Sequence, residues 1–90
     1  MSHLTADKTR LLARVRRLKG QIEAVERAVE SEADCGAILM LVASVRGAIG
    51  GLTAELIEAH VHNHVTGPED AAARSRGAEE LIGVVRTYLK

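Results

Sequence analysis

The chain has 90 residues, a formal net charge of zero, one cysteine and one aromatic residue, Tyr88. A chain this short forms one domain over residues 1–90, and it buries so little surface alone that oligomerisation is favoured. The lone cysteine excludes an intramolecular disulfide, and the lone aromatic excludes recognition of single-stranded bases by stacking. With no signal-peptide pattern and no uninterrupted apolar run of about 18 residues, we expect a cytoplasmic protein that does not enter a membrane.

Residues 1–5 are a polar arm that carries His3, and a first helix is predicted from about residue 6 to residue 31. Thr5 or Asp7 is a plausible cap for its first turn. Apolar residues then recur at alternating steps of four and three, as in a coiled-coil seam. They are Leu11, Val15, Leu18, Ile22, Val25 and Val29.

Half of the basic residues lie between Lys8 and Lys19, with no acidic residue among them. Basic residues on an exposed helix often serve solubility alone, but this unopposed density predicts a surface that contacts DNA phosphates. No helix-turn-helix, zinc-finger or ribbon motif is present, so binding would depend on phosphate contacts and DNA shape. The candidate DNA-binding residues are Lys8, Arg10, Arg14, Arg17, Lys19 and Arg46.

A second helix is predicted from about residue 36 to residue 65, because this stretch lacks proline and is apolar on more than one side. Asp34 is placed to cap it, and Cys35 lies in its first turn. Thr66, Gly67 and Pro68 end it. A third, amphipathic helix follows from about residue 70 to residue 88, and its two glycines, Gly77 and Gly83, weaken it.

The second helix carries possible metal ligands at both ends, and small residues in its middle. Cys35 and His60 are 25 positions apart, roughly 37 Å on a continuous helix, so one chain cannot bring both to one metal. An antiparallel second copy can, and the two helices would then cross near Gly47, Gly50 and Gly51. Mid-helix glycines each cost about 1 kcal/mol relative to alanine, and close backbone approach would explain them. The pattern predicts a two-fold dimer with two equivalent sites.

His60 and His64 lie one helical turn apart, with Cβ atoms about 6 Å from each other, so both imidazoles can bind one metal. Such a pair is often only solvated surface, and a lone cysteine is often a small buried apolar residue. Cys35 from the second copy, with His3 as a closing ligand, favours the metal site. His62 points away from His60, and no catalytic motif is present, so no enzyme is expected.

Four stretches, LLARVRRLKGQIEAVERAVE, DCGAILMLVASVRGAIGGL, AELIEAHVHNH and VRTYLK, resemble the CsoR/RcnR/FrmR family of copper-sensing, nickel/cobalt-sensing and formaldehyde-sensing bacterial repressors. The resemblance implies an all-α, three-helix protomer and an antiparallel four-helix-bundle dimer that assembles into a homotetramer. It also implies that the effector-free protein binds double-stranded operator DNA, and that effector binding releases it.

Within this resemblance, Cys35 and His60 match the thiol and histidine that the family shares. His64 replaces the second cysteine of the copper sensors, which disfavours a copper(I) site and persulfide sensing. The MSH start and His64 resemble the nickel/cobalt branch, in which the N-terminal amine and His3 join the ligands. We therefore predict nickel or cobalt as effector and a metal efflux gene as target. The alternative is a formaldehyde-responsive repressor of a detoxification operon that uses Cys35 and the amine of Ser2.

Overall fold

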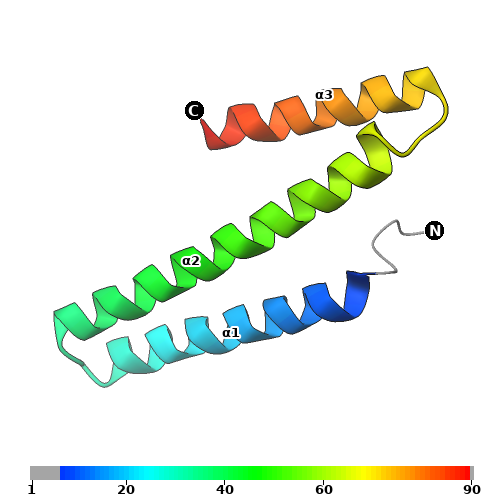
Figure 1. The fold of residues 1–90 in the computed structure, drawn as a ribbon. Helices are drawn as coiled ribbons and strands as arrows, with labels where there is room; N and C mark the ends of the chain where they lie inside the picture. Colours follow the sequence, from blue (N-terminus) through cyan, green and yellow to red (C-terminus); the bar gives the residue numbers. More distant parts are fainter. Residues whose placement is uncertain (1–6, 90) are drawn as a thin grey trace. The chain divides into compact units, whose positions relative to one another are not determined.

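The computed structural model describes residues 7–89, and regular structure within them is helical (Figure 1). The elements are α1 (Lys8–Glu30), α2 (Cys35–His60), the short π-helix η2 (Val61–Val65) and α3 (Ala71–Tyr88). The predicted all-α, three-helix fold is confirmed. The N-terminal arm, with Ser2 and His3, lies outside the described residues.

The chain divides into two compact units, the described parts of Ser2–Thr53 and of Ala54–Lys90. The first holds α1 and most of α2, and the second holds the end of α2, η2 and α3. Each unit is a helical hairpin with its own turn. A single domain over residues 1–90 therefore stays a prediction.

The turn between α1 and α2 is short because the backbone groups at both of its ends find partners locally. The N–H of Ala33 donates to the Ala28 carbonyl at 2.9 Å and that of Glu32 to the Val29 carbonyl at 3.1 Å. These two bonds form a Schellman motif, which requires a left-handed residue, and Glu32 supplies it with φ 56°. Asp34 then caps α2 as predicted, because its carboxylate accepts the Ala37 N–H at 3.3 Å.

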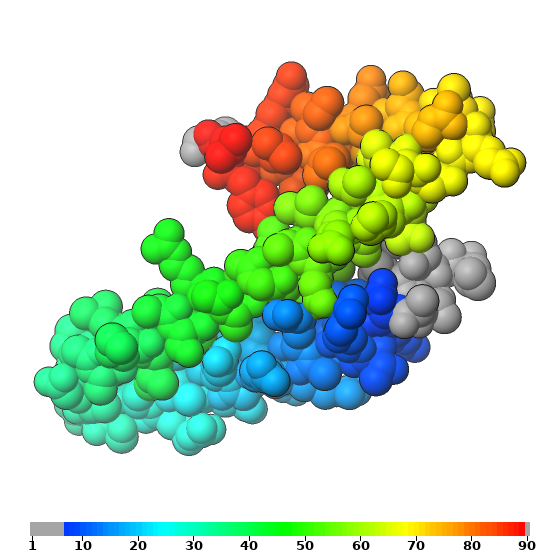
Figure 2. Space-filling view, viewed as in Figure 1, coloured from blue at the N-terminus to red at the C-terminus, as the bar shows by residue number. Residues whose placement is uncertain are grey.

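Two contacts set the antiparallel register of α1 on the first part of α2. The Gln21 side-chain amide donates to the Ser44 hydroxyl at 3.5 Å. Seven residues earlier on α1 and seven later on α2, the Arg14 guanidinium lies over Gly51, where a Cβ would be 2.8 Å from Nη1. Side chains of the two helices meet along this hairpin (Figure 2). The start of α1 differs from expectation: Asp7 makes no side-chain capping bond and pairs with Arg10 at 3.3 Å instead.

The described residues of the single chain enclose little core. Among them, the buried hydrophobic residues are Leu11 and Ala59, each 8% exposed. The predicted apolar seam of α1 is only partly covered, since Ile22 is 50% and Val29 57% exposed. Small domains with so little buried apolar surface are usually stabilised by oligomerisation, and the dimer and tetramer expected from the sequence stay predictions.

Helix α2 and η2 together form a continuous helical segment that contains a long apolar stretch. The segment Cys35–Val65 has 31 residues and a mean hydropathy of 1.8 over its most apolar stretch, so by length and composition it is able to cross a membrane. None of that stretch is buried within the single chain. The same composition suits a helix that other subunits cover, and composition alone does not separate the two cases. The sequence-based expectation of no membrane segment stays a prediction.

The turn between η2 and α3 is held by side chains on the first turn of α3. Asp70 caps α3 by accepting the N–H groups of Ala72 and Ala73 at 3.4 and 3.2 Å. Arg74 reaches back and donates from Nη1 to the carbonyls of Pro68 and Glu69 at 2.9 and 2.7 Å. These bonds define how α3 returns along the end of α2.

Candidate functional site

The backbone widens into a π-helical turn directly after His60, where sequence analysis predicted continuous α-helix to residue 65. Its defining bond runs from the Thr66 N–H to the Val61 carbonyl at 2.9 Å. Two side chains support the turn: Asn63 donates to the Ala59 carbonyl at 2.7 Å and Thr66 to the Val61 carbonyl at 3.3 Å. Single π-turns are frequent at functional sites because they reorient side chains that a regular helix would place elsewhere.

His60 and His64 lie beside one another across this turn. Their ring centroids are 4.9 Å apart and the ring planes are inclined by 34°. For a metal–nitrogen bond of about 2.0–2.1 Å, two imidazoles bound to one ion at about 90–110° would have centroids roughly 4.5–5.2 Å apart. The observed spacing is within this range, so the distance between the two rings is compatible with a shared divalent cation.

The environment of His60 distinguishes its two ring nitrogens. Nε2 lies 2.8 Å from the Gly77 carbonyl oxygen and 4.0 Å from Oε1 of Glu80. A carbonyl only accepts, so this bond requires the proton on Nε2 and leaves the Nδ1 lone pair to bind a ligand. Histidines that bind metals generally donate their other N–H to a carbonyl or carboxylate in this way.

Helix α3 contacts both histidines at Gly77, its buried residue. A Cβ at this position would be 2.9 Å from the His64 Cβ and would collide with the His64 carbonyl. In the sequence, Gly77 stands out only as a weak point of the helix, and Glu80 does not stand out. Neither role has a local signal, because each depends on the register between two segments.

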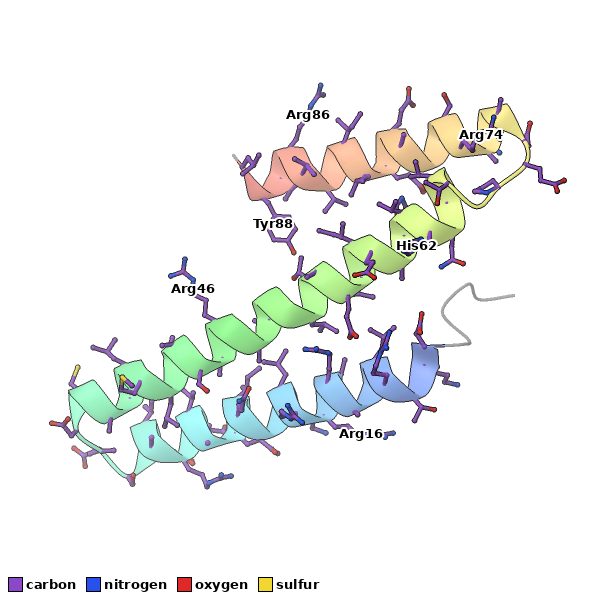
Figure 3. All side chains as sticks on the ribbon, viewed as in Figure 1. Arg16, Arg46, His62, Arg74, Arg86 and Tyr88 are labelled. Atoms are coloured by element: carbon purple, nitrogen blue, oxygen red, sulfur yellow. The ribbon has the colours of Figure 1, made fainter. Side chains whose placement is uncertain are left out.

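The other candidate ligands stand apart from this pair. His62, labelled in Figure 3, is exposed, and its Nε2 lies 4.0 Å from Oε1 of Glu58. Cys35 is an exposed free thiol at the first residue of α2, whereas His60 is the last residue of the same helix. Within residues 7–89 no three potential ligands form a group that could hold a metal ion.

The basic residues assigned to DNA binding, Lys8, Arg10, Arg14, Arg17, Lys19 and Arg46, are all exposed. Those on α1 extend over its first half, ahead of the acidic second half. Arg10 forms an ion pair with Asp7, and Arg14 lies against Gly51. Arg46 projects from α2 on the side away from α1 (Figure 3). The first hairpin thus presents cations along α1 and one more on α2.

A family model described as metal-sensitive transcriptional repressor matches residues 7–87. The chain belongs to this family. Its members are transcriptional repressors that bind operator DNA and sense metals or formaldehyde. The family is not enzymatic. The match covers α1, α2, η2 and all but the last residue of α3, and it confirms the resemblance drawn from the sequence.

Individual relatives support the same family, and of the three described next one is named for an effector, formaldehyde. The chain is 47% identical to "Uncharacterized protein in bioA 5'region" of Serratia marcescens over the full length of both. It is 33% identical, again over both full lengths, to the transcriptional repressor RcnR of Salmonella paratyphi B. Among solved structures, it resembles a glutamate-to-histidine variant of the formaldehyde-responsive regulator FrmR of Salmonella enterica serovar Typhimurium. That likeness has a TM-score of 0.89 and 43% identity, and covers 97% of this chain and 99% of the other.

Proposed function

We propose that this repressor responds to nickel or cobalt, and that the metal releases operator DNA and derepresses a metal efflux gene. The observation that carries the proposal is the pairing of His60 and His64, 4.9 Å apart, with His60 Nε2 occupied by the Gly77 carbonyl. Imidazoles together with one thiolate suit nickel(II) or cobalt(II) better than a sulfur-rich copper(I) site.

The ligand set of this proposal spans two chains. His60 and His64 of one chain would be joined by Cys35 of the partner subunit, and His3 with the N-terminal amine would close the site. An antiparallel second copy on α2 would deliver that thiol, since Cys35 and His60 end the same helix. The exposure of Met40, Ile49 and other apolar residues of α2 supports such a copy. Two such dimers would form the proposed homotetramer in the cytoplasm.

Operator binding is assigned to the exposed cations of the first hairpin: Lys8, Arg10, Arg14, Arg17, Lys19 and Arg46. Symmetry would multiply them into a broad positive surface for DNA phosphates. Metal capture would join the arm and α1 to the end of α2. It would release DNA only as far as the metal binds the DNA-free arrangement more tightly than the DNA-bound one.

The test is fluorescence anisotropy of labelled promoter duplex with the metal-free protein, to which nickel, cobalt, copper(I), zinc or formaldehyde is added in parallel. Release by nickel or cobalt is expected for the unaltered protein and for His62→Ala, and is expected to disappear in His64→Ala. His62→Ala is the matched control, since it removes an exposed imidazole from the same π-turn. Equal nickel or cobalt release by His64→Ala would contradict the proposal.

A formaldehyde-responsive repressor of a detoxification operon is the second candidate, supported by the 43% identity to the FrmR variant. Formaldehyde would condense with the Ser2 amine and the Cys35 thiol, lose one water, and leave a methylene between nitrogen and sulfur. The same titration separates the two candidates. Release by formaldehyde alone, unaffected in His64→Ala and abolished in Cys35→Ala, would establish this second function.

A further inference from the structure

Gly77 of α3 contacts both candidate effector histidines. Its carbonyl oxygen lies 2.8 Å from His60 Nε2. Its Cα faces the His64 backbone so closely that a Cβ would collide with the His64 carbonyl and lie 2.6 Å from the carbonyl carbon. A single residue thus combines an acceptor for one imidazole with the space that the other histidine needs.

The glycine is not explained by backbone conformation. No glycine among residues 7–89 has a positive φ, so Gly77 has ordinary helical geometry that alanine also adopts. In that geometry glycine costs about 1 kcal/mol relative to alanine. Gly83, six residues later on α3, is different, because no atom other than its chain neighbours and the nearby backbone of its own helix lies within 4 Å of the point where its Cβ would be. Close approach to His64 is therefore the physical reason for a glycine at position 77.

We infer that Gly77 is a positioning residue for the effector site. Its carbonyl holds His60 in the tautomer with the proton on Nε2, and its missing side chain lets α3 lie against His64. The two effects act on one pair of rings, so the register of α3 sets which nitrogen of His60 is available and how its ring faces His64. The role in effector binding rests on the proposed function, whereas the tautomer of His60 does not.

The first experiment uses the unaltered, metal-free protein. Nitrogen-15 NMR of its histidine rings separates protonated from bare ring nitrogens, and a coupling through the hydrogen bond connects Nε2 of His60 to the Gly77 carbonyl carbon. A single Nε2-protonated tautomer with that coupling is expected for His60. A His60 ring with the proton on Nδ1, or with the mixed tautomers of a solvated histidine, would overturn the inference.

The second experiment compares Gly77→Ala with Gly83→Ala. Both variants add the same methyl group to the same helix, but only the first meets His64. Removal of the groups that support a metal-binding histidine typically weakens affinity by about 10–100-fold. We expect cobalt affinity, followed by its visible absorption, to fall by about that factor in Gly77→Ala and to change less than about threefold in Gly83→Ala.

The ring spectrum and the DNA affinity of the metal-free variants separate positioning from simple structural support. In Gly77→Ala, His60 is expected to lose its single tautomer while metal-free DNA affinity is kept. A Gly77→Ala protein that is less stable, but keeps the tautomer and the cobalt affinity of the unaltered chain, would refute the positioning role. If Gly77→Ala does not fold, the ring spectrum of the unaltered protein decides the question alone.

The two proposals fail in different ways. A protein that releases DNA with neither nickel nor cobalt, yet has the Nε2 tautomer and the coupling to Gly77, would refute the metal function and leave the positioning of His60 intact. A protein that releases DNA with nickel or cobalt, but has a His60 ring without that tautomer, would refute the inference and leave the function intact.

Discussion

At the level of single residues, the chemistry of the site depends on the protonation of a few side chains. With Nε2 of His60 donating to Gly77, its Nδ1 is the nitrogen available to a ligand. A metal competes with protons for such a nitrogen and for the cysteine sulfur, because both bind metal in their deprotonated forms.

Nickel or cobalt affinity is therefore expected to fall as the pH is lowered, with protons released when the metal binds. The measurement is a metal titration at several pH values between about 5.5 and 8, the range in which imidazoles usually change charge. An affinity that stays constant across this range would contradict a ligand set made of imidazoles and a thiolate.

A second expectation for a single residue concerns Glu32, which adopts the left-handed conformation at the end of α1 with φ 56°. Glycine takes this conformation without the steric cost that a Cβ brings. Glu32→Gly is expected to raise the free energy of unfolding by roughly 0.5–1 kcal/mol, measured by urea denaturation. Ser31→Gly is the control: Ser31 has φ −84°, so added freedom there should only destabilise.

Among the helices, α1 has a basic first half and a mostly acidic second half, which begins after Gly20. The helix packs on α2 through a few contacts while its basic side chains stay exposed. An exposed row of cations beside an acidic stretch limits where a polyanion can lie. The first half of α1 is thus the part suited to DNA phosphates.

Arg17→Ala is expected to weaken operator binding at every sequence tested and to reduce the dependence of log affinity on log salt. The slope should fall by roughly 0.9 for each phosphate that the variant no longer neutralises. Anisotropy titrations at several salt concentrations measure it. Arg27→Ala, which removes a cation from the acidic half of the same helix, should leave the slope unchanged. Equal slopes for Arg17→Ala and the unaltered protein would remove Arg17 from the DNA surface.

Taken as a whole, the single chain leaves large apolar residues uncovered on each of its helices. On α2 these include Leu39, Met40, Val42 and Ile49, all of them exposed. Apart from the nearby backbone of α2 itself and the neighbouring residues, nothing within the described chain lies within 4 Å of the Cβ positions of Gly47 and Gly50. A second copy laid along this surface would bury apolar area that is otherwise in contact with water.

The melting temperature of the protein is therefore expected to rise with protein concentration, because association stabilises the folded chain by mass action. Ile49→Lys should shift the assembly toward smaller species in analytical ultracentrifugation and lower the melting temperature. Glu69→Gln makes the same change in net charge in the exposed turn before α3 and should do neither. A monomer that melts at one temperature over a hundredfold dilution would contradict the proposed dimer.

The order of residues alone predicts the helices and much of where they end. Caps and turns depend on bonds between near neighbours. The cap formed by Asp34 and the end of the second helical segment at Thr66-Gly67-Pro68 could therefore be predicted without any tertiary information. The proximity of His60 and His64 was readable for the same reason, since residues four apart share a helical face. The family followed from four stretches that extend over the chain.

What surrounds those residues depends on the tertiary structure. The contact of Gly77 with His60 and His64 and the placement of Arg14 over Gly51 each join segments that are far apart in sequence. Periodicity predicts which face of a helix is apolar, but not which residue of another segment lies opposite. Register is set by packing and by hydrogen bonds between segments, and these determine which nitrogen of His60 faces the Gly77 carbonyl.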